Sequence, residues 1–152
     1  MRLWHVDLIP FLPRQQLLGQ WRECVLIAKN LAEKGTPNHV LVNKILEYSS
    51  DDFLIYGEIV MREMRNRGYT ISEKSEHKFY EYNKLWRNRR KNDLNGEKPL
   101  YCRSLKIFYF WHTNQYLDQC YYNLQEKHDC NILTTTEYNK IQQAYVQLRG
   151  SI

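Results

Sequence analysis

A carboxylate on the first predicted helix is the side chain in this sequence best placed for chemistry. Glu23 follows Arg22 and points away from the apolar stripe that contains Leu17 and Trp21, so it lies over Gly19 on an open face. A glycine inside a helix costs about 1 kcal/mol relative to alanine. We therefore expect another chain or a ligand to approach closely in front of Glu23. The alternative is an exposed Arg22–Glu23 pair with no chemical role.

The α-amine of Met1 is a candidate nucleophile. The bulky Arg2 disfavours removal of the initiator methionine, so we expect Met1 to be retained. An α-amine is a weaker base than a lysine side chain, and more of it is unprotonated at neutral pH. The alternative is an ordinary chain terminus.

Basic residues gather in one segment. Residues 84–106 hold eight Lys/Arg and two acids, while the whole chain has a net charge of only +5. Aromatic side chains alternate with these cations, a pattern typical of surfaces that hold phosphates and stack unpaired bases. The alternative is a solvated, flexible loop. The candidate phosphate contacts are Arg87, Arg89, Arg90 and Lys91, and the nearby aromatic residues include Tyr80, Tyr82, Trp86 and Tyr101.

Apolar periodicity predicts an all-α protein. We expect an extended arm over residues 1–12, with Pro13 as the first helical residue. Five helices are predicted over residues 13–34, 38–47, 50–67, 78–91 and 134–148, and a sixth over 105–126, with an Asn-Gly turn at 95–96. Ser49 and the Thr134–Glu137 pair are expected to cap helices. The sequence therefore predicts a single compact helical domain over residues 1–152, with an extended arm that reaches the first long helix.

Several classes of protein are disfavoured. The four cysteines show no zinc-type spacing, the five histidines show no metal spacing, and no apolar run is long enough to span a membrane. We expect reduced thiols, no cofactor, no metal, no membrane partner and a cytoplasmic, nucleoid-associated monomer.

The opening of the chain resembles the pyrimidine-dimer DNA glycosylase family, the endonuclease V type first known from a bacteriophage, and is nearest to its bacterial branch. The likeness rests on Met-Arg-Leu-Trp-His, then Leu-Ile-Pro, then Leu-Pro-Arg-Gln-Gln-Leu-Leu-Gly-Gln and Arg-Glu. It covers about residues 1–35, and is fainter over 50–71. The resemblance implies an all-helical enzyme that combines glycosylase and apurinic-site lyase activities on damaged double-stranded DNA.

The resemblance also implies roles for individual residues. The Met1 amine takes the place of the nucleophilic amine, and Glu23 that of the essential carboxylate. Arg2 and Arg22 match arginines that contact DNA. In the DNA-binding pair Gln15 and Gln16, only Gln15 is an identity, because the family has histidine at the second position. Two departures are a retained methionine where the phage enzyme exposes threonine, and Leu26 in place of a DNA-binding arginine.

Two alternatives stay open. The chain could be a non-catalytic helical module that binds nucleic acid through the basic segment, in which case Glu23→Gln would be silent and charge reversal at Arg89 and Arg90 would remove function. It could also perform the same chemistry on abasic or oxidised sites.

Overall fold

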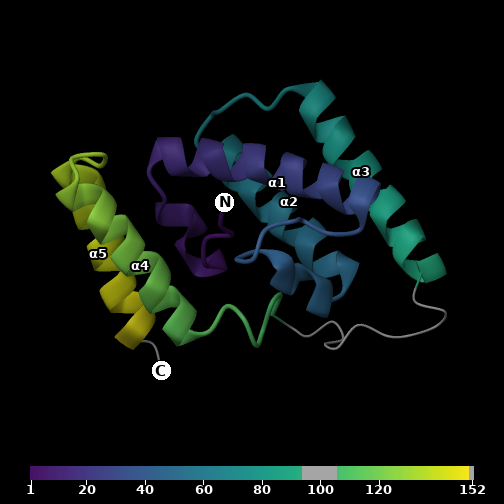
Figure 1. Cartoon of the computed structure of the whole chain (residues 1–152). Coiled ribbons are helices and arrows are strands. Elements are labelled where there is room, and N and C mark those ends of the chain that lie inside the picture. Colours follow the sequence, from purple (N-terminus) through teal and green to yellow (C-terminus); the bar gives the residue numbers. More distant parts are fainter. Residues whose placement is uncertain (94–105, 151–152) are drawn as a thin grey trace.

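The computed structural model describes residues 1–93 and 106–150, and every regular element in them is a helix (Figure 1). The elements are the 3-10 helices η1 (Val6–Phe11) and η2 (Asn43–Glu47) and the α-helices α1 (Arg14–Lys34), α2 (Ser50–Asn66), α3 (Glu73–Asp93), α4 (Asn114–Asp129) and α5 (Thr135–Gly150). These two ranges contain no strand, and the all-α prediction is confirmed.

Helices α1, α2 and α3 pack together, and the α4–α5 pair lies on the other side of η1 (Figure 1). α1 and α3 run in the same direction, since Trp21 Nε1 donates to Ser75 Oγ at 3.4 Å near their beginnings and Arg89 Nη1 donates to Glu33 O at 2.8 Å near their ends. The α4–α5 pair is a helical hairpin, and its second helix, α5, packs against η1.

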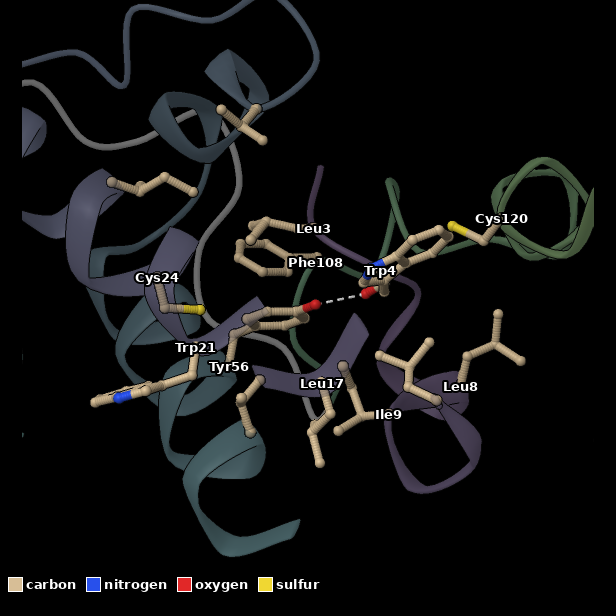
Figure 2. Close-up of a cluster of buried hydrophobic side chains, with 14 of the residues drawn as sticks. Leu3, Trp4, Leu8, Ile9, Leu17, Trp21, Cys24, Tyr56, Phe108 and Cys120 are labelled. Atoms are coloured by element: carbon tan, nitrogen blue, oxygen red, sulfur yellow. Dashed lines mark hydrogen bonds between the residues drawn. The ribbon is translucent and has the colours of Figure 1, made fainter. Parts of the chain in front are cut away.

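Residues 3–5 of the N-terminal arm (residues 1–5) lie inside the core, and Met1 and Arg2 are partly buried. Leu3 and Trp4 are buried against Tyr56 of α2 and Phe108 of the segment before α4 (Figure 2). Because buried apolar area supplies most of the stability of a small domain, the arm is fixed by the same packing that holds the helices together.

The prediction of an extended arm over residues 1–12 is wrong in its second half, because Val6–Phe11 is a 3-10 helix. His5 caps this helix, with Nδ1 accepting from the backbone N–H of Asp7 at 3.2 Å. At its other end Arg67 donates to the carbonyls of Leu12 and Pro10, at 2.7 and 2.9 Å. Pro13 is the N-cap of α1 and not its first residue.

Element boundaries differ from prediction where a cap or a distant partner decides them. α3 begins earlier than residue 78, with Ser72 Oγ accepting from the N–H of Ser75 at 3.2 Å. The helix predicted from residue 105 begins at Asn114, after the Thr113 cap. Phe108 has a φ of 50°, and its N–H donates to Asp52 Oδ2 at 2.9 Å, which keeps this stretch out of the helix.

One other predicted helix is shorter in the structure, and two predicted caps are present. The helix expected over 38–47 is reduced to η2, Asn43–Glu47. The Thr134–Glu137 cap is confirmed, because Glu137 N donates to Thr134 Oγ1 at 3.2 Å and Glu137 Oε2 accepts from Thr134 N at 2.9 Å. The Ser49 cap is also confirmed. Leu105 and the Asn-Gly turn lie outside the described residues.

Candidate active site at the N-terminal arm

The backbone N–H and C=O of Arg2 are both held by side chains of α1. Its N–H donates to Glu23 Oε2 at 3.1 Å, and its carbonyl accepts from Gln20 Nε2 at 3.0 Å. Residues three apart on a helix share a face, so Gln20 and Glu23 act on Arg2 from neighbouring positions. The arm therefore meets α1 at the carboxylate that the sequence singles out.

This contact brings the start of the chain to Glu23. The nitrogens of two consecutive residues are separated by at most about 4 Å. Since Arg2 N lies 3.1 Å from Glu23 Oε2, the α-nitrogen of Met1 lies within about 7 Å of that oxygen. Met1 is only partly buried, so its amine is not sealed in the core.

A buried hydrogen-bond network holds the next residues of the arm. Gln20 is 1% exposed, and its Oε1 accepts from the N–H of Trp4 at 2.8 Å. The Tyr56 hydroxyl lies 2.7 Å from the Trp4 carbonyl (Figure 2). It also lies 2.9 Å from Gln20 Oε1. Burial raises the pKa of Tyr56 well above its ordinary value, so its hydroxyl stays a donor.

The second half of the chain also holds the arm. The Tyr116 hydroxyl of α4 donates to the Leu3 carbonyl at 2.5 Å, and His112 Nδ1 accepts from the N–H of Val6 at 3.0 Å. His5 Nε2 donates to the His112 carbonyl at 2.9 Å, and the two imidazole rings stack at 5.2 Å. Burial lowers the pKa of both histidines. Both rings accept a hydrogen bond at Nδ1, which requires their neutral forms.

The face of α1 in front of Glu23 is open. A Cβ placed on Gly19 would meet, outside the helix backbone, only Arg22 Nη2 at 3.9 Å in the part of the chain that the structure describes. Gln15 and Arg22 are exposed on the same helix, and Leu26 is 45% exposed. Space for a ligand thus exists where the sequence predicts it.

The other candidate DNA contacts near the arm are less exposed. The guanidinium of Arg2 lies 5.7 Å over the ring of Trp4, and its charge acts on Tyr116 and Cys120 of α4. Gln16 is partly buried, and its Oε1 has no hydrogen-bond partner among the described residues. Of the candidate DNA contacts, Gln15 and Arg22 are thus the two that face solvent on α1.

The basic candidates on α3 serve contacts within the fold. Arg87 pairs with Asp51, Arg89 donates to the carbonyl of Glu33, and Arg90 donates to the carbonyls of Leu46 and Tyr48. Burial lowers the pKa of Arg90. Lys91 is exposed.

These four residues lie away from the arm. Glu33 is ten positions after Glu23 on α1, a distance of about 15 Å along the helix axis, and Arg89 contacts it there. Tyr101 and the basic residues at 98 and 103 lie outside the described residues.

Sequence reasoning missed the residues that hold the arm: Gln20, Tyr56, His112 and Tyr116. One signal was available. Gln20 lies among the apolar residues of α1, between Leu17 and Cys24, where a polar side chain is unexpected unless it has partners. The other three are aromatic or histidine residues that the sequence does not distinguish from core residues.

The described residues contain no group of His, Cys, Asp and Glu side chains that could hold a metal ion. In the same part of the chain, no helix combines the length and apolar character that a membrane crossing needs.

The fold and site define an all-helical protein in which the chain terminus lies beside a carboxylate of the first long helix. The family model described as pyrimidine dimer DNA glycosylase matches residues 1–77, half of the chain, and the chain belongs to this family. Comparisons with curated proteins and with solved structures found no match. The matched region ends within α3, so His112 and Tyr116 reach the arm from outside it.

Proposed function

We propose that this protein removes a base at pyrimidine dimers in double-stranded DNA and then cuts the strand, with the Met1 amine as nucleophile and Glu23 as the essential carboxylate. The observation that carries the proposal is the 3.1 Å hydrogen bond from Arg2 N to Glu23 Oε2, since it brings the terminal amine to a carboxylate on an open helix face. Family membership supports the class of reaction.

In the first step, the unprotonated Met1 amine attacks the anomeric carbon of the deoxyribose. The glycosidic bond breaks, its electron pair leaves with the base, and the base takes up a proton. The amine then gives up one proton, and the ring C–O bond breaks with its electron pair going to the ring oxygen, which takes up a proton. The product is a protonated Schiff base between Met1 and the sugar. Glu23 stabilises the positive charge that develops on the sugar and then on the imine.

In the second step, a proton leaves the carbon next to the imine, and the 3′ phosphate leaves with the electron pair of its C–O bond. This β-elimination breaks the strand, and water then hydrolyses the imine to free Met1. Glu23 is the group near the amine suited to move these protons.

DNA would lie on the exposed face of α1. Arg22 and Gln15 would contact the phosphate backbone without reading sequence, and Gly19 would let the sugar approach Glu23. Because a nucleotide inside a duplex hides its anomeric carbon, the substrate must kink and extrude a nucleotide, which is easier at a lesion that has weakened stacking. Arg2 would be available to DNA if its guanidinium left the Trp4 ring.

The test is borohydride trapping. Untagged protein is incubated with a duplex containing one thymine dimer, and separately with one containing an abasic site, in the presence of borohydride. We expect a covalent protein–DNA adduct that peptide mapping assigns to residue 1. A matched protein with an acetylated N-terminus should give none. Full strand cleavage by the acetylated protein, or an adduct at a lysine side chain, would overturn the proposal.

A further inference from the structure

Gln20 is a buried polar side chain that makes hydrogen bonds to two residues of the arm and to one residue of α2. It is 1% exposed, donates to the carbonyl of Arg2, and accepts from the N–H of Trp4 and the hydroxyl of Tyr56. A buried amide is stabilising only when its donors and acceptors are satisfied. An apolar residue could fill the same position in the α1 stripe. Packing alone therefore does not explain why an amide lies here.

The two hydrogen bonds to the Arg2 backbone indicate the role of this amide. Gln20 holds the carbonyl of Arg2 at 3.0 Å and Glu23 holds its N–H at 3.1 Å. Glu23 thus holds the Met1–Arg2 peptide group and Gln20 holds the Arg2–Leu3 peptide group, so the two peptide groups that flank the Arg2 Cα are both anchored to α1. The contact to Trp4 prevents the arm from sliding along the helix. The Met1 amine then has only the rotations of its own residue left.

We propose that Gln20 is a positioning residue for the Met1 amine, which sets the place of that amine relative to the Glu23 carboxylate. This inference rests on the proposed function, because the amine is positioned for attack on the sugar. Reaction rates fall about 100-fold when reacting groups are misplaced by about 1 Å. Loss of the Gln20 contacts should therefore reduce the chemical step while leaving DNA binding on the α1 face intact.

The test compares Gln20→Met and Gln20→Glu with the untagged wild-type protein. Methionine is similar in length but makes none of these three hydrogen bonds. A protonated glutamic acid can donate to Arg2 O and accept from Trp4 N, whereas an ionised one cannot donate. The measurements are the single-turnover rate of borohydride-trapped adduct at residue 1 between pH 5.5 and 8.5, the Kd for uncleaved lesion DNA, and hydrogen exchange of the Trp4 amide.

Asn83→Met is the matched control. Asn83 is also a buried amide, 6% exposed, but its Nδ2 donates to Phe79 O at 2.8 Å within α3, away from the arm. It reports what general loss of a buried hydrogen bond does to the rate.

We expect Gln20→Met to lower the adduct rate about 10- to 100-fold at every pH, with Kd changed less than twofold and faster exchange of the Trp4 amide. Gln20→Glu should approach the wild-type rate at the acid end and fall progressively below it as pH rises. Asn83→Met should keep the wild-type rate. A Gln20→Met rate within twofold of wild type, or an equal loss in Asn83→Met, would overturn the inference.

Failure of the proposed function gives a different result, because the wild-type protein itself would then form no adduct at residue 1. In that case hydrogen exchange decides the structural part: unchanged protection of the Trp4 amide in Gln20→Met would show that Gln20 does not hold the arm.

Discussion

The ring of Phe79 on α3 lies directly against the backbone of Gly57 on α2. A Cβ placed on Gly57 would be 2.1 Å from Phe79 Cζ, and both residues are buried. The closest approach of α2 and α3 thus depends on a hydrogen atom at position 57. Trp21 and Phe53 enclose the same ring, at centroid distances of 5.3 and 5.9 Å, so Phe79 has no space into which to retreat.

Gly57→Ala should therefore destabilise the protein, although alanine is the better helix former. Overpacking of this kind costs about 1–3 kcal/mol, and urea unfolding followed by tryptophan fluorescence measures it. Phe79→Leu in the same background should recover part of the loss, since it removes the clashing ring atoms. A Gly57→Ala protein as stable as wild type would contradict the packing described.

Gly19→Ala should have the opposite effect on stability. Among the described residues, and apart from the backbone of α1 itself, only Arg22 Nη2 lies near the added Cβ, at 3.9 Å, so the gain in helix propensity of about 1 kcal/mol is unopposed. Gly19→Leu should be tolerated by the fold as well, but should weaken binding of lesion DNA about tenfold or more by filling the space before Glu23. The measurements are urea unfolding and DNA binding at fixed salt. Wild-type affinity in Gly19→Leu would mean that DNA does not approach this face.

Gly19 also shows which features of the site could be predicted from the sequence alone. Glu23, Gly19 and the long helix that carries them follow from apolar periodicity and from the cost of a helical glycine, and the structure has the predicted open face. The close packing at Gly57 could not be predicted in the same way, because nothing in the local sequence indicates that Phe79 packs against it. Features that depend on one helix can be predicted from its local sequence, whereas features that depend on contact between two helices cannot.

The same distinction explains the N-terminal arm and the basic segment. Val6–Phe11 depends on His5 and on Arg67, which is more than fifty residues away, so its 3-10 helix was not predictable from local rules. The contacts of Arg89 and Arg90 within the fold were not predictable either, because the carbonyls that they meet belong to other elements.

Glu23→Gln should abolish strand cleavage and preserve binding. The amide is isosteric and still offers an oxygen to the N–H of Arg2, so the arm stays in place. It lacks the negative charge that stabilises the cationic sugar. We expect a loss of at least 100-fold in single-turnover cleavage of the dimer duplex, consistent with removal of one electrostatic group, with Kd within threefold. Cleavage near the wild-type rate would remove Glu23 from the mechanism.

Stability should fall as the pH falls below the ordinary histidine pKa of about 6.5. Burial lowers the pKa of His5 and of His112 in the folded protein. Between the folded and the unfolded pKa values, the unfolded chain holds protons that the folded chain lacks, so acid favours unfolding. The stability is present above the unfolded pKa and is lost on acidification.

Urea unfolding at pH 7.5, 6.5 and 5.5 checks this pH dependence. His5→Asn, which keeps an oxygen able to accept from the N–H of Asp7, should show a shallower decline than wild type. The exposed His77→Gln serves as the control and should follow the wild-type curve. Equal slopes for all three proteins would contradict the role of the His5–His112 pair.

Arg90→Met should act on stability and not on DNA affinity. Arg90 donates to the carbonyl of Leu46 in η2, at 2.6 Å, and to that of Tyr48 directly after it, and losing hydrogen bonds to a charged group costs about 1.5–3 kcal/mol. The neighbouring Lys91→Met should change the free energy of unfolding by less than about 0.5 kcal/mol. If Arg90→Met instead reduces the salt dependence of lesion binding, Arg90 contacts phosphate.

The histidine and tyrosine that hold the arm have a consequence for how the protein is made. The arm is synthesised before His112 and Tyr116, which follow more than one hundred residues later. Until they emerge, Leu3 and Val6 lack two of their partners. Translation therefore completes the set of contacts that holds the arm only after the segment before α4 and the first turn of α4 have been made.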